Sequence, residues 1–349
     1  MRRASVLLPL ALAGVASLSA CGSSSGSGSG NANGLTPPPT TAAAPTGTAA
    51  VPSDTSGATA STTAASSGAT PEPGSPAAGG GTVVPVVAGE NFWGSITSQI
   101  GGAHVKVTSI ITDPNADPHT YETDPKDAAA ISSASFVVLN GLGYDDFASK
   151  LLAASPNASR TVISLDKVNA VTGDNPNPHL WYNPVYVKGS ADAIAAQLSK
   201  VDPADAASFT ANEQTFLADY QPYIDTLTKI KSAYPGAKIG FTERVPGYLV
   251  AAAGLTLATP ASFAQSVEDG NDPSPQDTAA IDAAMKNKTV KVLFYNGQVT
   301  SPTTQRVQSL AKAAGVPVVG VAETIPASYP DFQSWQIAQA QQVLKALGG

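Results

Sequence analysis

The chain has 349 residues, a formal net charge of −7 and only 13% charged side chains. This negative balance argues against nucleic acid or an anionic lipid surface as a partner. The only cysteine, Cys21, excludes an intramolecular disulfide and a metal cage built from several thiolates.

The N-terminus has the order of a lipoprotein signal peptide. Arg2 and Arg3 precede an apolar run at residues 6–15, and Leu-Ser-Ala stands directly before Cys21. The run is shorter than the roughly 20 apolar residues that a membrane span requires. We therefore predict that residues 1–20 are removed and that acylated Cys21 anchors the chain to the extracytoplasmic face of the cell membrane. A buried free thiol after an apolar helix is the alternative.

The next segment is biased in composition. Residues 22–82 contain Asp54 and Glu72 as their only charged side chains, and they contain no aromatic residue. Such a segment cannot bury enough apolar surface to offset its chain entropy. We expect residues 21–82 to form a disordered tether and the folded part to begin at Val83.

Apolar, β-branched runs alternate with Ala-rich amphipathic stretches from Val83 onward. Strands separated by helical patterns of 10–15 residues indicate βαβ units with a parallel sheet. We predict strands over 83–88, 105–111, 136–140 and 161–165, and helices over 92–100, 125–132, 145–155 and 184–200. Residues 83–201 therefore form an N-terminal α/β lobe.

The same alternation restarts after Pro235. Its periodic segments cover 238–242, 245–254, 275–287, 290–295, 303–314 and 316–321, and a helix follows over 329–347. We predict a C-terminal α/β lobe over residues 235–349. The expected fold class is α/β, with two lobes of parallel sheet flanked by helices.

Residues 202–234 connect the two lobes. Their bulky side chains recur at intervals of three, four and seven residues, which is typical of one helical face: Phe209, Phe216, Tyr220, Tyr223, Leu227, Ile230 and Tyr234. Asp202 followed by Pro203 suits the start of a helix. We predict one long linking helix that kinks or restarts at Pro222. Two separate surface helices are the alternative.

Two of the three histidines stand in matching contexts. His119 and His179 each follow a proline in a loop rich in Pro, Asp and Asn, between a predicted strand and a predicted helix. Such loops bind ligands in α/β folds, and imidazole is the commonest metal ligand. The pair therefore favours a metal site over two surface side chains. We assign no role to His104.

Two carboxylates complete the predicted site. Glu243 and Glu323 each follow an apolar strand of the second lobe, and a carboxylate at the carboxyl end of a buried parallel strand faces the crevice. Either alone could equally be a solvated loop acid. Two carboxylates also balance the charge of a divalent cation held by two neutral imidazoles. We predict that His119, His179, Glu243 and Glu323 bind a divalent metal ion.

Other motifs are weaker. The sequence has no phosphate-binding glycine loop with lysine, no His-Glu-x-x-His helix and no nucleophile elbow. The acidic residues 268–272 lack the spacing of an EF-hand loop, so we expect a solvated loop there.

From about Val84 to the C-terminus, the chain resembles the metal-specific solute-binding proteins of ABC importers, the TroA/ZnuA-like family. The resemblance rests on a combination of short segments: Gly-Glu-Asn-Phe-Trp-Gly at 89–94, Ile-Gly-Gly-Ala-His-Val-Lys-Val-Thr at 100–108, Asp-Pro-His-Thr-Tyr-Glu at 117–122, Asn-Gly-Leu-Gly-Tyr at 140–144 and Asn-Pro-His-Leu-Trp at 177–181. The combination is specific, although no single segment is.

The resemblance implies two α/β lobes joined by one long helix, with metal bound in the cleft and an ABC permease as the membrane partner. The family's two histidine ligands fall on His119 and His179. Its third position, histidine in many zinc-type members and glutamate in many manganese-type members, falls on Glu243. Its fourth, usually aspartate, falls on Glu323. The chain departs from the family by lacking a histidine-rich loop and by placing Pro222 in the linking helix.

These observations predict a lipid-anchored, monomeric receptor that captures Mn²⁺ or Zn²⁺ and delivers it to an ABC permease, without enzymatic activity. A metallohydrolase using the histidines and a carboxylate to activate water is one alternative. Four protein ligands would leave little room for that water, because catalytic sites keep a coordination position open. A cell-surface adhesin displayed on the tether is another alternative.

Overall fold

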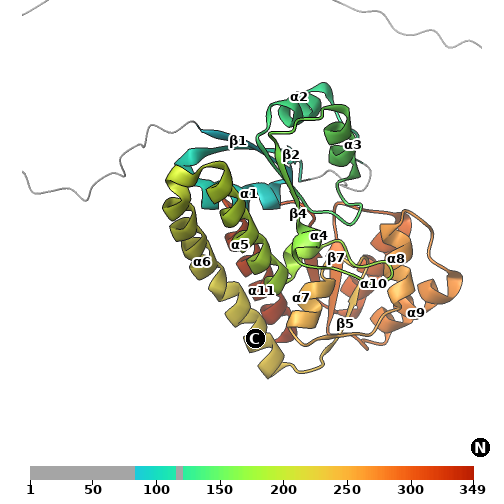
Figure 1. The fold of residues 1–349 in the computed structure, drawn as a ribbon. Helices are drawn as coiled ribbons and strands as arrows, with labels where there is room; N and C mark the ends of the chain where they lie inside the picture. Colours follow the sequence, from blue (N-terminus) through green and yellow to red (C-terminus); the bar gives the residue numbers. More distant parts are fainter. Residues whose placement is uncertain (1–82, 115–120) are drawn as a thin grey trace, which may run out of the picture. The chain divides into compact units, whose positions relative to one another are not determined.

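The computed structural model describes residues 83–114 and 121–349 of the chain. The predicted signal peptide, the tether, Cys21 and His119 lie outside the described residues. Two four-stranded parallel sheets lie within them, each flanked by helices (Figure 1).

The first sheet has the strand order β2-β1-β3-β4, and all its strands are parallel. Its strands are β1 (Val84–Glu90), β2 (Val105–Ile111), β3 (Phe136–Leu139) and β4 (Thr161–Ser164). Its helices are α1 (Asn91–Gly101), α2 (Pro125–Ser133), α3 (Asp146–Ala154), α4 (Leu165–Val168) and α5 (Pro184–Val201), with 3₁₀ turns at Gly102–His104 and Leu180–Tyr182. Side chains on both faces of β1 are buried in separate apolar clusters, Val86 in one and Val87 in the other. Burial on both faces explains the nearly continuous apolar sequence of this strand.

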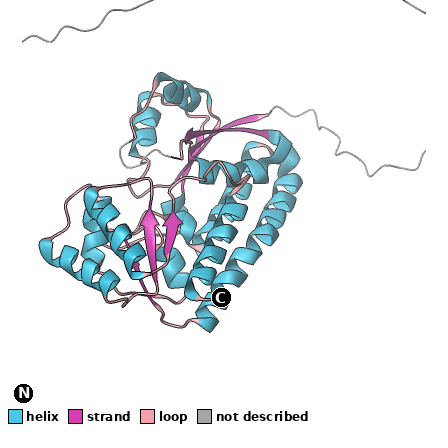
Figure 2. Ribbon diagram, turned by 180° about the vertical axis from the view of Figure 1, so that it is seen from behind, coloured by secondary structure: helices cyan, strands magenta, loops and turns pink. Residues whose placement is uncertain are grey.

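The second sheet repeats this topology, with the order β6-β5-β7-β8 and parallel pairing throughout. Its strands are β5 (Lys238–Phe241), β6 (Thr256–Leu257), β7 (Val292–Asn296) and β8 (Val318–Val321). Its helices are α7 (Gly247–Ala252), α8 (Ala261–Glu268), α9 (Pro275–Lys286), α10 (Pro302–Ala314) and α11 (Phe332–Leu347). Figure 2 shows strands of this sheet lying between helices on both sides. The predicted fold class is confirmed.

One long helix, α6 (Ala206–Ala233), joins the lobes after a 3₁₀ turn at Pro203–Asp205. It continues through Pro222 as a single helix, so the predicted restart at this proline is wrong, whereas the alternative of a kink stays a prediction. The burial of the side chains around Pro222 explains why the helix continues. Tyr220 and Tyr223 are buried in the core, whereas Pro222 itself is exposed. Packing on the buried face therefore outweighs the one hydrogen bond that proline cannot donate.

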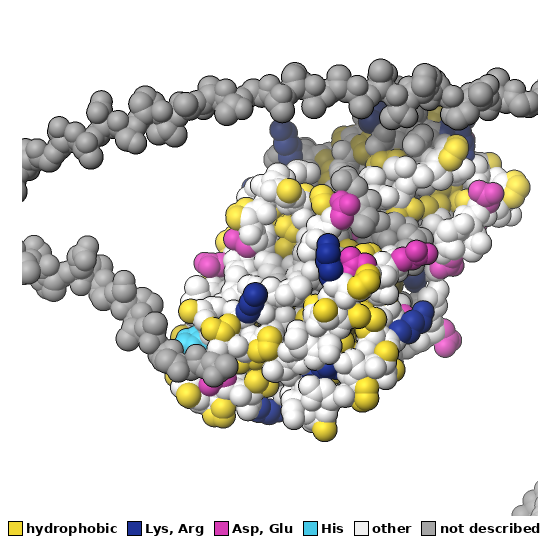
Figure 3. Space-filling view, turned by 90° about the horizontal axis from the view of Figure 1, so that it is seen from above, with side chains coloured by type: hydrophobic (Ala, Val, Ile, Leu, Met, Phe, Trp, Pro, Cys, Tyr) yellow, Lys and Arg dark blue, Asp and Glu magenta, His cyan; other side chains and the backbone are white. Residues whose placement is uncertain are grey.

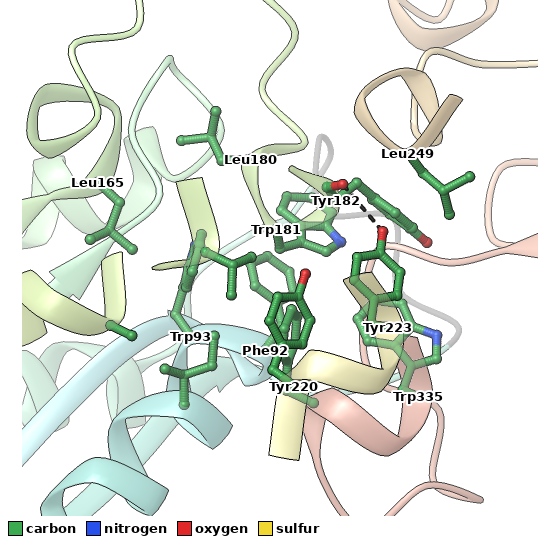
Figure 4. Close-up of a cluster of buried hydrophobic side chains, with 14 of the residues drawn as sticks. Phe92, Trp93, Leu165, Leu180, Trp181, Tyr182, Tyr220, Tyr223, Leu249 and Trp335 are labelled. Carbon is green, nitrogen blue, oxygen red and sulfur yellow. Dashed lines mark hydrogen bonds between the residues drawn. The ribbon is translucent and has the colours of Figure 1, made fainter. Parts of the chain in front are cut away.

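The helix α6 packs against α1 and α5 of the first lobe and against α11 of the second. A single apolar cluster accordingly contains Trp93 of α1, Tyr220 and Tyr223 of α6, and Trp335 of α11 (Figure 4). The Tyr223 hydroxyl donates a hydrogen bond of 3.3 Å to the carbonyl of Tyr182, drawn as a dashed line in Figure 4. The two lobes thus share one core through the linking helix.

The surface has no segregated charge on the face shown in Figure 3. Lysine and arginine side chains there are scattered singly among acidic and uncharged ones. None of the described helices combines the length and apolar character that crossing a membrane requires.

Candidate metal centre

Three of the four predicted ligands, His179, Glu243 and Glu323, come together in the structure. Each is at most 1% exposed. His179 Nε2 of the first lobe lies 3.2 Å from Glu323 Oε2 of the second. Glu243 and Glu323 are joined by Asn296, which donates to both. The fourth predicted ligand, His119, lies outside the described residues, in the segment that follows β2.

The sheet topology explains how the two carboxylates meet. The strands β5, β7 and β8 are neighbours in the second sheet and run parallel, so their carboxyl ends lie along one edge. Glu243 follows β5, Asn296 ends the middle strand β7, and Glu323 follows β8. The backbone pairing of β5 with β7 continues one residue beyond β5, because Thr242 N–H donates to the Phe294 carbonyl at 3.1 Å. This edge presents the three polar side chains in a row.

The side chain of Asn296 was not predicted as part of the site. Its amide donates to Glu243 Oε2 at 2.6 Å and to Glu323 Oε1 at 2.7 Å, and it is fully buried. The sequence does contain a signal for Asn296. It ends an apolar strand that lies in the chain between the strands preceding Glu243 and Glu323. Asparagine is uncharged, however, and it ends many strands without binding anything.

Hydrogen bonds fix the loop that carries His179 and orient its imidazole ring. Its loop is fixed to the end of β3 because the Asn140 side-chain amide donates to the Pro178 carbonyl at 2.9 Å. Asn177 Oδ1 accepts from His179 N–H at 3.0 Å and lies 2.5 Å from Nδ1. Since a carbonyl oxygen only accepts, this contact fits the tautomer with the proton on Nδ1, and Nε2 faces Glu323. A histidine held in this way can bind metal through Nε2.

Polar contacts cross between the lobes around the site. The Tyr144 hydroxyl donates to Glu323 Oε2 at 2.9 Å. The Asn177 amide donates to the Arg244 carbonyl at 2.8 Å, and the Tyr248 hydroxyl donates to the Asn177 carbonyl at 2.9 Å. The residues that orient His179 therefore also contact the second lobe.

The acidic stretch at residues 268–272 divides into two environments. Residues 269–272 are exposed, as expected of a solvated loop. The side chain of Glu268 is only 4% exposed and accepts from the Arg244 guanidinium at 2.6 Å. The expectation was wrong for Glu268, because the sequence did not show that an arginine after β5 reaches the end of α8.

Two further acids are buried near the end of β1. Glu90 is fully buried, and neither of its carboxylate oxygens has a hydrogen-bond partner among the described residues. Burial raises the pKa of Glu90 well above its ordinary value, and the charge of Asp145 adds to this effect. Asp145 accepts from the backbone N–H of Asn140 at 2.5 Å and of Gly141 at 3.0 Å. Burial nevertheless raises the pKa of Asp145 to about 6.

His104, to which the sequence assigns no role, lies apart at the start of α6. Its Nδ1 is 2.7 Å from Asp205 Oδ2, and its ring contacts the edge of Phe209. Together with Asp202, these side chains form a group whose possible ligand atoms lie within 4.8 Å of one another. The contact with Asp205 accounts for the position of this imidazole.

Residues 86–346 match the family model described as zinc-uptake complex component A, periplasmic. The chain belongs to this family. The resemblance predicted from the short sequence segments is confirmed, and the family is one of binding components for metal uptake, not of enzymes.

The similar proteins include two manganese-binding lipoproteins and a ZnuA of known structure. The manganese-binding lipoprotein MntA of Bacillus subtilis is 27% identical over 224 residues, 62% of this chain and 72% of that protein. The MntA of Halalkalibacterium halodurans is 28% identical over 138 residues, 39% of this chain and less than half, 46%, of that protein. The crystal structure of a ZnuA, 24% identical, has a TM-score of 0.62 and is matched over 76% of this chain and all of that one. At this identity, the structural likeness shows the fold.

Proposed function

We propose that the chain is an extracytoplasmic solute-binding lipoprotein that captures Mn²⁺ or Zn²⁺ and delivers the ion to an ABC permease. The observation that carries this proposal is the meeting of His179 with Glu243 and Glu323, from two lobes, in a fully buried site. Buried charges require compensation, and a divalent cation supplies it for two carboxylates. Imidazole and carboxylate groups are ligands for both metals.

The proposed ligands are His119, His179, Glu243 and Glu323. For His179, Glu243 and Glu323 the supporting geometry is the 3.2 Å approach of His179 Nε2 to Glu323 Oε2 and the amide that joins the two glutamates. His119 is proposed from its sequence context. Two neutral imidazoles and two carboxylates give a neutral site with a divalent ion. The ion is the cargo of the protein, and no covalent bond is made or broken in the transport step.

The proposed function is tested by metal-dependent stability. A ligand that binds only the folded state adds RT ln(1 + [L]/Kd), about 4 kcal/mol at a thousandfold excess over Kd. We expect Zn²⁺ and Mn²⁺ to raise the melting temperature of the wild type. The variant His179→Ala should lose most of this shift, whereas the control His104→Ala, which removes an imidazole outside the site, should keep it. Equal metal-induced shifts in both variants and the wild type would refute the assignment.

The proposed localisation depends on Cys21. The two MntA relatives are named as lipoproteins, and Cys21 follows the signal-peptide pattern. We expect Cys21→Ser to move the protein from the membrane fraction to the soluble fraction in a fractionation experiment, with Ser19→Ala as the control that keeps the thiol. A Cys21→Ser protein that stays with membranes in high salt would contradict the lipid anchor.

A further inference from the structure

The side-chain amide of Asn296 holds one oxygen of each glutamate in the candidate site. A single nitrogen, Nδ2, donates to Glu243 Oε2 at 2.6 Å and to Glu323 Oε1 at 2.7 Å. An amide nitrogen has two hydrogens, so each carboxylate receives one of them. All three side chains are at most 1% exposed, and water therefore does not compete for these bonds.

The orientation of this amide is fixed by its other end. Asn296 Oδ1 accepts from the backbone N–H of Gln298 at 3.0 Å. The Gln298 side chain donates to Thr324 Oγ1 at 2.9 Å and accepts from the backbone N–H of Glu323. Because Oδ1 already meets a donor, Nδ2 must face the carboxylates. Asn296 and Gln298 thus tie the end of β7 to the loop that presents Glu323.

The oxygen of Glu323 that faces the imidazole is not the one that Asn296 holds. Oε2 lies 3.2 Å from His179 Nε2 and accepts from the Tyr144 hydroxyl at 2.9 Å, whereas Oε1 accepts from Asn296. The two oxygens of this carboxylate therefore have different roles, one directed across the cleft and one bound within the second lobe.

We propose that Asn296 is a positioning residue that limits each glutamate to one oxygen at the metal and so sets the choice between metals. Binding through a single oxygen of each glutamate keeps the number of ligand atoms low, toward the four that protein zinc sites favour. Manganese favours more oxygen ligands in octahedral geometry, which two-oxygen binding by the glutamates would supply. This inference rests on the proposed function and its ligand set.

The test compares the manganese-to-zinc affinity ratio of the wild type with those of Asn296→Ala and Asn296→Ser. Alanine removes both hydrogen bonds, and serine has one hydroxyl hydrogen, which can serve only one glutamate. We expect the ratio to shift toward manganese by about tenfold for alanine, the scale of one hydrogen bond to a charged group. Serine should give a smaller shift in the same direction. Competition with a chelator in one buffer measures both affinities.

The control variant is Gln339→Ala. Gln339 is also a buried amide of the second lobe, and it donates to the Gly320 carbonyl in β8 at 3.0 Å. Its loss should leave the ratio at the wild-type value. X-ray absorption of the manganese-loaded protein provides a second readout, because Asn296→Ala should raise the number of oxygen ligands.

The outcomes separate the two proposals. Binding of both metals with an unchanged ratio in Asn296→Ala and Asn296→Ser would overturn the role of Asn296 and leave the proposed function intact. A wild type that binds neither metal would overturn the proposed function, and this inference with it. If Asn296→Ala does not fold, the ratio in Asn296→Ser decides, because serine retains a donor at the same position.

Discussion

The buried carboxylates of this protein differ in the groups that donate hydrogen bonds to them. Glu243 and Glu323 accept from Asn296, and Glu268 accepts from Arg244. Asp145 accepts from two backbone N–H groups, whereas both oxygens of Glu90 lack a hydrogen-bond partner among the described residues. A buried carboxylate without donors is costly when charged, so Glu90 is the acid at which a change of protonation should affect folding most directly.

The first prediction concerns Glu90→Gln. The folded protein holds a proton on Glu90 more tightly than the unfolded chain does. At pH values between the ordinary and the raised pKa, the folded state therefore binds more protons than the unfolded state. The free energy of unfolding should therefore fall as pH rises above about 4.3, the ordinary glutamate value, by up to about 1.4 kcal/mol per pH unit. Glutamine keeps the volume and does not titrate. We therefore expect the free energy of unfolding of the variant, measured by urea denaturation, to depend less steeply on pH.

The raised pKa of Asp145 contributes a similar fall in stability, which ends at about pH 6. Both proteins keep Asp145, so the difference between their slopes reports the contribution of Glu90. Glu122→Gln, at an exposed position, is the control and should follow the wild type. A slope in Glu90→Gln that equals the wild-type slope at every pH above about 4.3 would show that the folded protein holds the Glu90 proton no more tightly than the unfolded chain does.

The sequence could predict the charged residues of the site but not the residues that orient them. Glu243 and Glu323 are recognisable because a charge at the end of an apolar parallel strand is costly without a partner. Asn296, Asn177 and Tyr144 are neutral polar residues, and each is compatible with an ordinary turn or surface. Their roles depend on hydrogen bonds between strands and lobes, which only the tertiary structure brings together.

At the scale of elements, α6 shows how packing overrides a local rule. Six of its seven predicted bulky positions are buried, so the helical face was correctly predicted from spacing. The same spacing could not show that this face would hold the helix together across Pro222. By contrast, β6 and α8 were missed, because a strand of two residues and a helix of eight are too short to show a period.

The second prediction is that Pro222→Ala stabilises the protein. Alanine supplies the N–H that can donate to the carbonyl of Ala218, and position 222 is exposed, so no packing is lost. Proline in a helix interior costs about 3 kcal/mol, and its restriction of the unfolded chain returns about 0.4–1 kcal/mol. We expect a gain of about 2–2.6 kcal/mol in the free energy of unfolding, measured by urea denaturation.

A matched control for this prediction is Gln214→Ala, at another exposed position of α6. It should change the free energy of unfolding by less than about 0.5 kcal/mol, as surface substitutions usually do. A Pro222→Ala protein that is no more stable than this control would mean that the helix has already relaxed around the proline at little cost.

At the scale of the whole folded part, two lobes with the same strand order behave as parts of one core. The apolar cluster around α6 includes residues from both sheets, and hydrogen bonds also cross between the lobes. The Asn91 side chain, for example, both donates to and accepts from the backbone of Ile325. The repeated pattern of strands and helices predicts two lobes, but it cannot show that they share a core, because that depends on which faces of α6 meet α1, α5 and α11.

The last prediction is that the two lobes unfold in a single transition. Met285 is buried in a separate apolar cluster that belongs to the second lobe alone, and Met285→Ala should cost about 2–5 kcal/mol. In a Trp335→Phe background, the remaining tryptophans, Trp93 and Trp181, belong to the first lobe. If the shared core makes unfolding cooperative, their fluorescence should report the full destabilisation, with the same midpoint as far-UV circular dichroism. A fluorescence midpoint that stays at the value of the Trp335→Phe parent, while the circular dichroism transition broadens or divides, would show instead that the lobes unfold independently and that α6 only connects them.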